Sequence, residues 1–118
     1  MLLMQIPLRD YITTMRVMAV STLRAFWERY PDTEQPLKAW FDEVANASWS
    51  QPSDIKEHFR SAFILKNRRV VFNIKGNDYR LIAAIAYKLQ IAYVKFVGTH
   101  KDCRDRGRVM AEMRSDRT

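Results

Sequence analysis

The apolar residues of this sequence follow two different periods, and this change of period is the strongest constraint on its fold. Between residues 23 and 44 apolar side chains recur at intervals of three and four, the spacing of one face of an α-helix. From Val70 onward the interval is two, as in a β-strand with one buried face. The pattern predicts an α+β domain in which helices cover one face of a sheet.

The helical half is expected to form a hairpin of two helices after a short extended run over residues 16–20. The first helix has Ser21 or Thr22 as its N-cap and ends at Pro31-Asp32; the second follows an Asp32-Thr33 cap and tolerates Pro36 in its first turn. Their apolar stripes are Leu23, Phe26, Trp27 and Tyr30, then Leu37, Trp40, Phe41 and Val44. A brief helical turn is expected over residues 53–59, where Asp54 and Glu57 have the capping-box offset.

The second half predicts three consecutive antiparallel strands over residues 70–75, 79–87 and 91–97. Gly76-Asn77 tolerates positive φ and therefore favours a tight hairpin between the first two strands. The expected order is β-α-α-β-β-β, with the helical hairpin packed on one face of an antiparallel sheet and the other face open.

A chain of 118 residues can bury one hydrophobic core, so a single domain is expected over residues 15–102. Residues 1–14 are interpreted as an N-terminal extension, with Met1 and Met15 as alternative starts, and residues 103–118 as a basic tail. A single cysteine, no recognisable signal peptide and no long apolar run favour a cytoplasmic protein without a membrane partner.

The net charge of +7 lies entirely in the second half of the chain. Residues 1–63 contain 7 Lys and Arg against 8 Asp and Glu, whereas residues 64–118 contain 13 against 5. Such a one-sided distribution is typical of a surface that binds a polyanion, and nucleic acid is the first candidate. The alternative is a solvated sheet edge, where cations only prevent aggregation.

Basic side chains and tyrosines alternate along the predicted strands, a mixture that suits single-stranded RNA. The RNA-binding candidates are Lys66, Arg68, Arg69, Asn73, Lys75 and Lys95. The tyrosines of this region are Tyr79, Tyr87 and Tyr93, and about half of them are expected to be ordinary packing residues of strands.

Two residues are candidates for catalysis. Arg80 is out of pattern in an apolar strand unless it meets an anion; the alternative is a structural salt bridge to Asp78 or Glu57. His100 follows the last strand and has a side chain that can exchange a proton at neutral pH. His58 is interpreted as structural. The scarcity of Cys and His and the lack of clustered carboxylates predict no metal and no cofactor.

Several motifs in order resemble the HigB toxins of type II toxin–antitoxin modules, which belong to the RelE/ParE superfamily. The motifs span about residues 15–102 and include Phe26-Trp27-x-x-Tyr30-Pro31-Asp32, Pro36-Leu37-x-Ala39-Trp40, Trp49-x-x-Pro52-x-Asp54-Ile55-Lys56, the run from Phe63 to Ile74, Gly76-Asn77-x-Tyr79-Arg80-Leu81 and Phe96-Val97-Gly98-Thr99-His100.

The resemblance implies a RelE-like fold and a toxin that cleaves mRNA on the ribosome without metal, inhibits translation and is held inactive by a HigA-type helix-turn-helix antitoxin. It places Arg80 at the scissile phosphate and His100 as proton donor or second phosphate contact. Two alternatives are open: a non-catalytic inhibitor like the ParE branch, and an inactive remnant that binds RNA or antitoxin. The second rests on Cys103, which stands where the family usually has tyrosine, and on the Arg-rich end.

Overall fold

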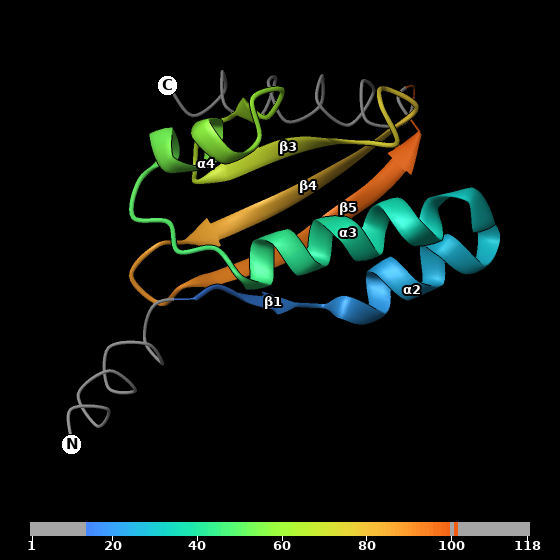
Figure 1. Ribbon diagram of the computed structural model, residues 1–118, viewed down its shortest axis with the longest axis horizontal. Coiled ribbons are helices and arrows are strands. Elements are labelled where there is room, and N and C mark those ends of the chain that lie inside the picture. Colours follow the sequence, from blue (N-terminus) through green and yellow to red (C-terminus); the bar gives the residue numbers. More distant parts are fainter. Residues whose placement is uncertain (1–13, 100, 102–118) are drawn as a thin grey trace.

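Four strands lie between residues 63 and 99, and a fifth strand from the start of the domain completes the sheet (Figure 1). The computed structural model describes residues 14–99 and 101. Along the chain its elements are β1 (Arg16–Met18), α2 (Val20–Arg29), the 3₁₀ turn η2 (Pro31–Thr33), α3 (Glu34–Ala45), α4 (Pro52–His58), β2 (Phe63–Ile64), β3 (Arg69–Ile74), β4 (Tyr79–Ala86) and β5 (Ile91–Thr99).

The strands lie in the order β1-β5-β4-β3-β2. Strands β2 to β5 form an antiparallel meander, whereas β1 pairs with β5 in parallel and makes the sheet mixed. The predicted α+β class and element order are confirmed, with this parallel edge as a difference from the expected antiparallel sheet. The parallel pairing of β1 with β5 is possible because a long connection that includes the helices, and not a tight hairpin, separates the two strands along the chain.

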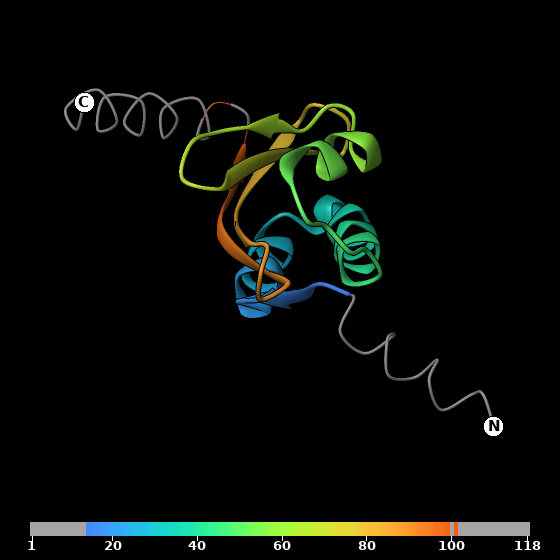
Figure 2. The same cartoon turned by 90° about the vertical axis from the view of Figure 1, so that its left-hand side faces the viewer.

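Helices α2 and α3 cover one face of the sheet, and the turned view shows both on the same side of it (Figure 2). Leu23, Leu37 and Val44 of the predicted stripes are completely buried against the strands. Across the interface the ring of Phe72 on β3 lies 5.4 Å from that of Trp40, measured between ring centroids. The predicted helical hairpin therefore supplies most of the apolar cover of this face.

The side-chain caps that the sequence predicts are not formed at the starts of the helices. Ala19, with a left-handed φ of 67°, precedes α2, so Ser21 and Thr22 lie inside the helix and do not cap it. Thr33 occupies the predicted N-cap position of α3, but its hydroxyl donates to the carbonyl of Tyr30 at 2.7 Å and α3 has no side-chain cap hydrogen bond. In α4, the Asp54 carboxylate accepts the N–H of Ser50 at 2.8 Å, so the predicted capping box is wrong although the helix is present.

The predicted hairpin between β3 and β4 is confirmed, but its turn is shifted by one residue. Positive φ values occur at Lys75 (54°) and Gly76 (67°), and Asn77 is not among the residues with positive φ. Two features were not predicted: β5 continues to Thr99, and β2 adds a strand too short to show a period. None of the helices in the described part of the chain is long and apolar enough to span a membrane.

Candidate nucleic-acid interface

The face of the sheet opposite α2 and α3, here called the outer face, is built from rows of side chains that lie across neighbouring strands. Strand register places on it the following rows: Asn73, Arg80 and Gly98; Phe63, Val71, Ile82 and Phe96; and Arg69, Ala84 and Tyr93. Directly opposed residues lie on the same face of a sheet, so each row is one line of neighbours. The outer face thus alternates polar, apolar and mixed rows.

The centre of the outer face is not open, contrary to the expectation from the sequence. Val71 is 7% exposed and Ile82 is 1% exposed, and Leu65 and Phe96 pack against them. These side chains form a small apolar cluster separate from the main core. Cations and exposed rings are therefore confined to the rows and turns around this cluster.

Arg80 is half-buried beside this apolar cluster. Its Nη2 donates to Oδ1 of Asn77 at 2.9 Å, while its Nε is buried and has no hydrogen-bond partner among the described residues. Across residues 14–99 it forms no salt bridge, and Asp78 lies instead 3.5 Å from Nζ of Lys75. The structural ion pair considered as an alternative for Arg80 is not formed. A partly buried cation without a carboxylate is a place where an anion is favoured.

Three other candidates share the outer face with Arg80. Asn73 lies directly across from it on β3. Arg69 lies opposite Ala84, four residues along β4 and about 13 Å away at the usual strand rise. Lys95 sits at a bulge of β5, and its Nζ is 5.5 Å from the centre of the Tyr93 ring. The structure therefore brings Arg80 and Asn73 together and sets Arg69 and Lys95 further along the same surface.

Lys66 and Arg68 lie at the other end of the sheet. Both are exposed in the turn between β2 and β3, where Asn67 and Arg68 have positive φ values of 61° and 59°. The carbonyl of Arg68 accepts the N–H of Ile85 at 2.8 Å. Ile85 is five residues from Arg80 along β4, about 17 Å. These two cations extend the basic surface but do not touch Arg80.

Lys75 is engaged elsewhere, in a cluster that ties the β3–β4 turn to η2. Its Nζ lies 3.4 Å from a carboxylate oxygen of Asp32, and Tyr79 donates its hydroxyl to the same carboxylate at 3.0 Å. The hydrogen bond and charge of Asp32 raise the pKa of Lys75, and burial together with the Asp32 hydrogen bond raises the pKa of Tyr79. This ion pair gives Lys75 a structural contact on the helical side.

The tyrosines divide as the sequence suggested. Tyr79 packs against the rings of Phe26 and Tyr30, and Tyr87 is half-buried on the main core, where burial raises its pKa. Tyr93 is 38% exposed on the outer face. Tyr93 is thus the member of this group with a ring available for contact.

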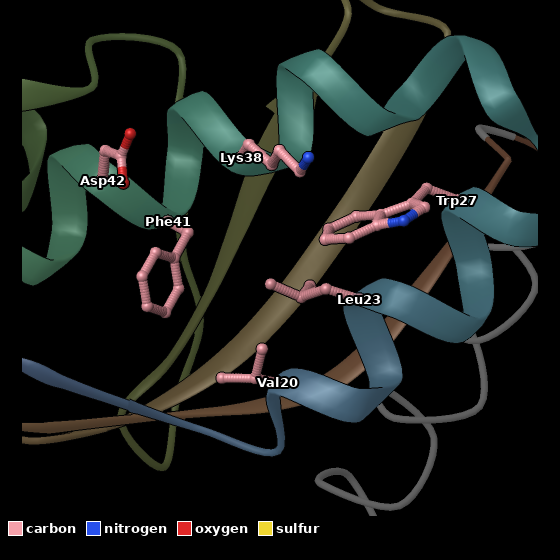
Figure 3. Close-up of a pocket in the computed structure, with 6 residues that line it drawn as sticks. All are labelled: Val20, Leu23, Trp27, Lys38, Phe41 and Asp42. Carbon is pink, nitrogen blue, oxygen red and sulfur yellow. The ribbon is translucent and has the colours of Figure 1, made fainter.

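An apolar groove lies between α2 and α3 on the helical side (Figure 3). Val20, Leu23 and Trp27 from one helix face Phe41, Lys38 and Asp42 from the other. Lys38 is paired with Glu34 at 2.7 Å and lies over the Trp27 ring. The polar side chains of its lining are the paired Lys38 and the carboxylate of Asp42, and its other lining residues are apolar.

Two sequence candidates, His100 and Cys103, lie outside the described residues. His58 stacks on Phe59 with ring centroids 4.6 Å apart, in line with its structural interpretation.

Sequence reasoning overlooked Asn77 as the partner of Arg80 and Phe63 as an exposed ring on the outer face. The order Asn77-x-x-Arg80 was a usable signal, because residues flanking a tight turn lie close together. Within residues 14–99 and 101, no three His, Cys, Asp or Glu side chains gather to hold a metal ion.

Comparison with known proteins agrees with this architecture. Residues 33–103 match the model of the HigB_toxin family, described as the RelE-like toxic component of a toxin-antitoxin system. The chain is 29% identical over 90 residues to the mRNA interferase toxin HigB of Escherichia coli (strain K12), an alignment that covers 75% of this chain and 86% of the relative. The mRNA interferase HigB of Shigella flexneri matches with the same identity and coverage. The chain belongs to the HigB family, the RelE-like toxic components of toxin–antitoxin systems.

Proposed function

We propose that this toxin is a metal-independent endoribonuclease that cleaves mRNA on the ribosome in the cytoplasm and thereby inhibits translation. Its proposed partners are mRNA, the ribosome and a HigA-type helix-turn-helix antitoxin that holds it inactive. Family membership and the names of the relatives support RNA cleavage. The observation that carries the proposal is Arg80, a half-buried guanidinium without a salt bridge in the described part of the chain.

The chemistry needs no metal when cations and a proton donor are present. The ribose 2′-hydroxyl loses its proton to a general base, and its oxygen attacks phosphorus. The bond from phosphorus to the 5′-oxygen breaks, and that oxygen takes up a proton from a general acid. The products are a 2′,3′-cyclic phosphate and a 5′-hydroxyl. Negative charge grows on the phosphoryl oxygens in the transition state, where the Arg80 guanidinium would offset it. His100, one residue after β5, is the proposed proton donor or second phosphate contact.

The remaining candidates are assigned to grip RNA. Asn73, Arg69 and Lys95 share the outer face with Arg80, and Lys66 and Arg68 extend the path of the RNA toward the far end of β4. Lys75 is a weaker candidate, because Asp32 and Asp78 already neutralise it. Phosphate contacts of this kind set affinity and register without reading sequence.

We also place the toxin domain at residues 15–102. Met15 is 3% exposed, and its N–H donates to the carbonyl of Ala47 at 2.8 Å, which ties the start of this range to the end of α3. Residues 1–14 are proposed as an extension and residues 103–118 as a basic tail.

Induction of the gene in cells, followed by mapping of mRNA 5′ ends, tests the proposed function. The unaltered toxin is expected to arrest growth and to produce new 5′-hydroxyl ends within coding regions. Arg80→Ala is expected to reduce these cuts by about 10²- to 10³-fold, the usual effect of removing one group that stabilises transition-state charge. Arg24→Ala is the matched control, because Arg24 is an exposed arginine on α2. Growth arrest with intact mRNA would contradict the proposal and favour a ParE-like inhibitor.

A further inference from the structure

Phe63 is an exposed aromatic ring on an edge strand, and neither the core nor the cation chemistry described above explains it. The side chain is 64% exposed on β2, the two-residue strand at the end of the sheet. Burial of a Phe side chain is favourable by roughly 1.5–3 kcal/mol, and an apolar side chain on a sheet edge invites unwanted pairing. A ring exposed in this position is available to contact a binding partner.

The backbone that carries Phe63 is held in place although its ring is exposed. Nζ of Lys56 donates to the carbonyls of Arg60 and Ala62, each at 2.8 Å. Nδ2 of Asn73 donates to the carbonyl of Ser61 at 3.5 Å, and Phe63 itself pairs with Val71 on β3. Because this backbone is already ordered, binding through the ring requires no further ordering of the strand.

The position of Phe63 relates it directly to Arg80. Phe63 lies opposite Val71, and Asn73, two residues further along β3, lies opposite Arg80. With the usual strand spacing and rise, the two positions are about 10 Å apart across the sheet and about 7 Å apart along it. At this separation the Arg80 guanidinium can contact one phosphate while the Phe63 ring stacks on the neighbouring base.

The chemistry around Phe63 favours a nucleic acid over a protein partner. The rows of the outer face contain arginine, asparagine, aromatic and aliphatic side chains but neither aspartate nor glutamate. Aromatic rings beside cations bind unpaired bases by stacking while the cations meet phosphates. A face of this composition would repel neither the phosphates nor the bases of a single-stranded RNA.

We propose that the Phe63 ring stacks on an unpaired base next to the phosphate contacted by Arg80, and so positions single-stranded RNA on the outer face. The inference rests on the proposed function, which supplies the RNA and the role of Arg80. It adds a binding residue that acts through its ring and not through charge.

Binding of a short single-stranded RNA with 2′-O-methyl groups at every position tests this inference without cleavage. The dissociation constant is measured at several salt concentrations. Phe63→Ala and Phe63→Leu are expected to weaken binding by about 5- to 100-fold, the usual effect of losing one stacked base, while Phe63→Tyr keeps affinity. The dependence of binding on salt is expected to stay unchanged in all three variants, because no phosphate contact is lost.

Two controls separate this inference from the proposed function. Leu89→Ala removes a side chain that is 68% exposed in the β4–β5 turn and should leave binding unchanged. Arg80→Ala should weaken binding and lower the salt slope by about one, as expected for a phosphate contact. If Arg80→Ala changes neither binding nor cleavage while the Phe63 variants lose affinity, the proposed role of Arg80 fails and the ring contact stands.

The inference is overturned if Phe63→Leu or Phe63→Ala binds the RNA as tightly as the unaltered protein does. This holds even if the variant binds the antitoxin less tightly. An unaltered protein that shows no binding to this RNA would overturn it as well. Loss of affinity in Phe63→Tyr equal to that in Phe63→Ala would also contradict it, because the ring would then not be the source of binding.

Discussion

At the scale of single residues, Arg80 and Asn77 show how local sequence sets the geometry of a candidate site. The β3–β4 turn brings these two residues together, and the 2.9 Å hydrogen bond from Nη2 of Arg80 to Asn77 restrains the guanidinium. The Nε atom is buried and has no hydrogen-bond partner in the part of the chain that the structure describes. Because the guanidinium is already restrained, it needs little reorganisation when negative charge develops on a phosphate.

Asn77 is therefore expected to be a positioning residue for Arg80. Asn77→Ala should lower kcat for RNA cleavage on the order of ten-fold, the scale of a hydrogen bond to a charged group, with KM nearly unchanged because the cation itself remains. Steady-state kinetics of the variant measure both constants. Asn46→Ala is the control, since Asn46 makes a comparable 2.8 Å bond to the carbonyl of Asp42 at the end of α3. Equal losses in the two variants would argue against a positioning role.

The sequence was informative about individual residues only where a period or motif bears on them. Arg80 stood out because a charged residue interrupts an apolar strand. Lys75 looked equivalent to the other cations, since its contacts with Asp32 depend on a helix 43 residues earlier in the chain, a long-range contact that no local pattern reports. Phe63 was overlooked because a strand of two residues has no period to detect.

At the scale of elements, the cluster of Asp32, Lys75 and Tyr79 fastens the helical layer to the β3–β4 hairpin. Lys75 and Tyr79 both approach the Asp32 carboxylate, and the pKa of each is raised in the folded protein. A group whose pKa is raised on folding stabilises the fold below its ordinary pKa and loses that contribution as the pH rises through the folded value. The cluster is thus expected to weaken in alkaline solution.

Thermal unfolding as a function of pH measures this effect. The melting temperature should fall as the pH rises above about 10, where the ordinary pKa values of tyrosine and lysine lie. Tyr79→Phe removes one of these groups while preserving the ring contacts with Phe26 and Tyr30, so the alkaline fall should become shallower. A variant with an unchanged pH profile would show that Tyr79 does not contribute to it.

The order of elements was predictable because each long element has a clear period and a clear end, such as Pro31 after α2 and Gly76 between β3 and β4. The details of the ends were not. The three predicted side-chain caps are not formed. A left-handed Ala19 precedes α2, the Thr33 hydroxyl donates to the carbonyl of Tyr30, and the Asp54 carboxylate accepts the N–H of Ser50. The parallel pairing of β1 with β5 was also beyond prediction, since β1 has only three residues.

At the scale of the whole molecule, one face of the sheet stabilises the fold and the other face carries the candidate site. One face is buried under α2 and α3, where Phe72 is 1% exposed, and the other carries Arg80 and Phe63. The two phenylalanines are matched in chemistry and lie on opposite faces of neighbouring strands. The fold is therefore expected to respond very differently to their removal.

Phe72→Ala should lower the free energy of unfolding by about 3–5 kcal/mol, because it leaves a cavity between Trp40 and Trp49. Phe63→Ala should change it by less than about 0.5 kcal/mol, as expected for an exposed side chain. Denaturant unfolding of both variants makes the comparison. A large loss of stability in Phe63→Ala would mean that its ring is part of the fold and not free for a ligand.

The central claim is that Arg80 on the outer face of the sheet carries the cleavage of RNA. Its most direct test is the single-turnover rate at which the purified toxin cuts a defined mRNA bound to ribosomes. We expect Arg80→Ala to lower this rate by about 10²- to 10³-fold and Arg24→Ala to leave it unchanged. Cleavage by Arg80→Ala at the rate of the unaltered protein would contradict the claim.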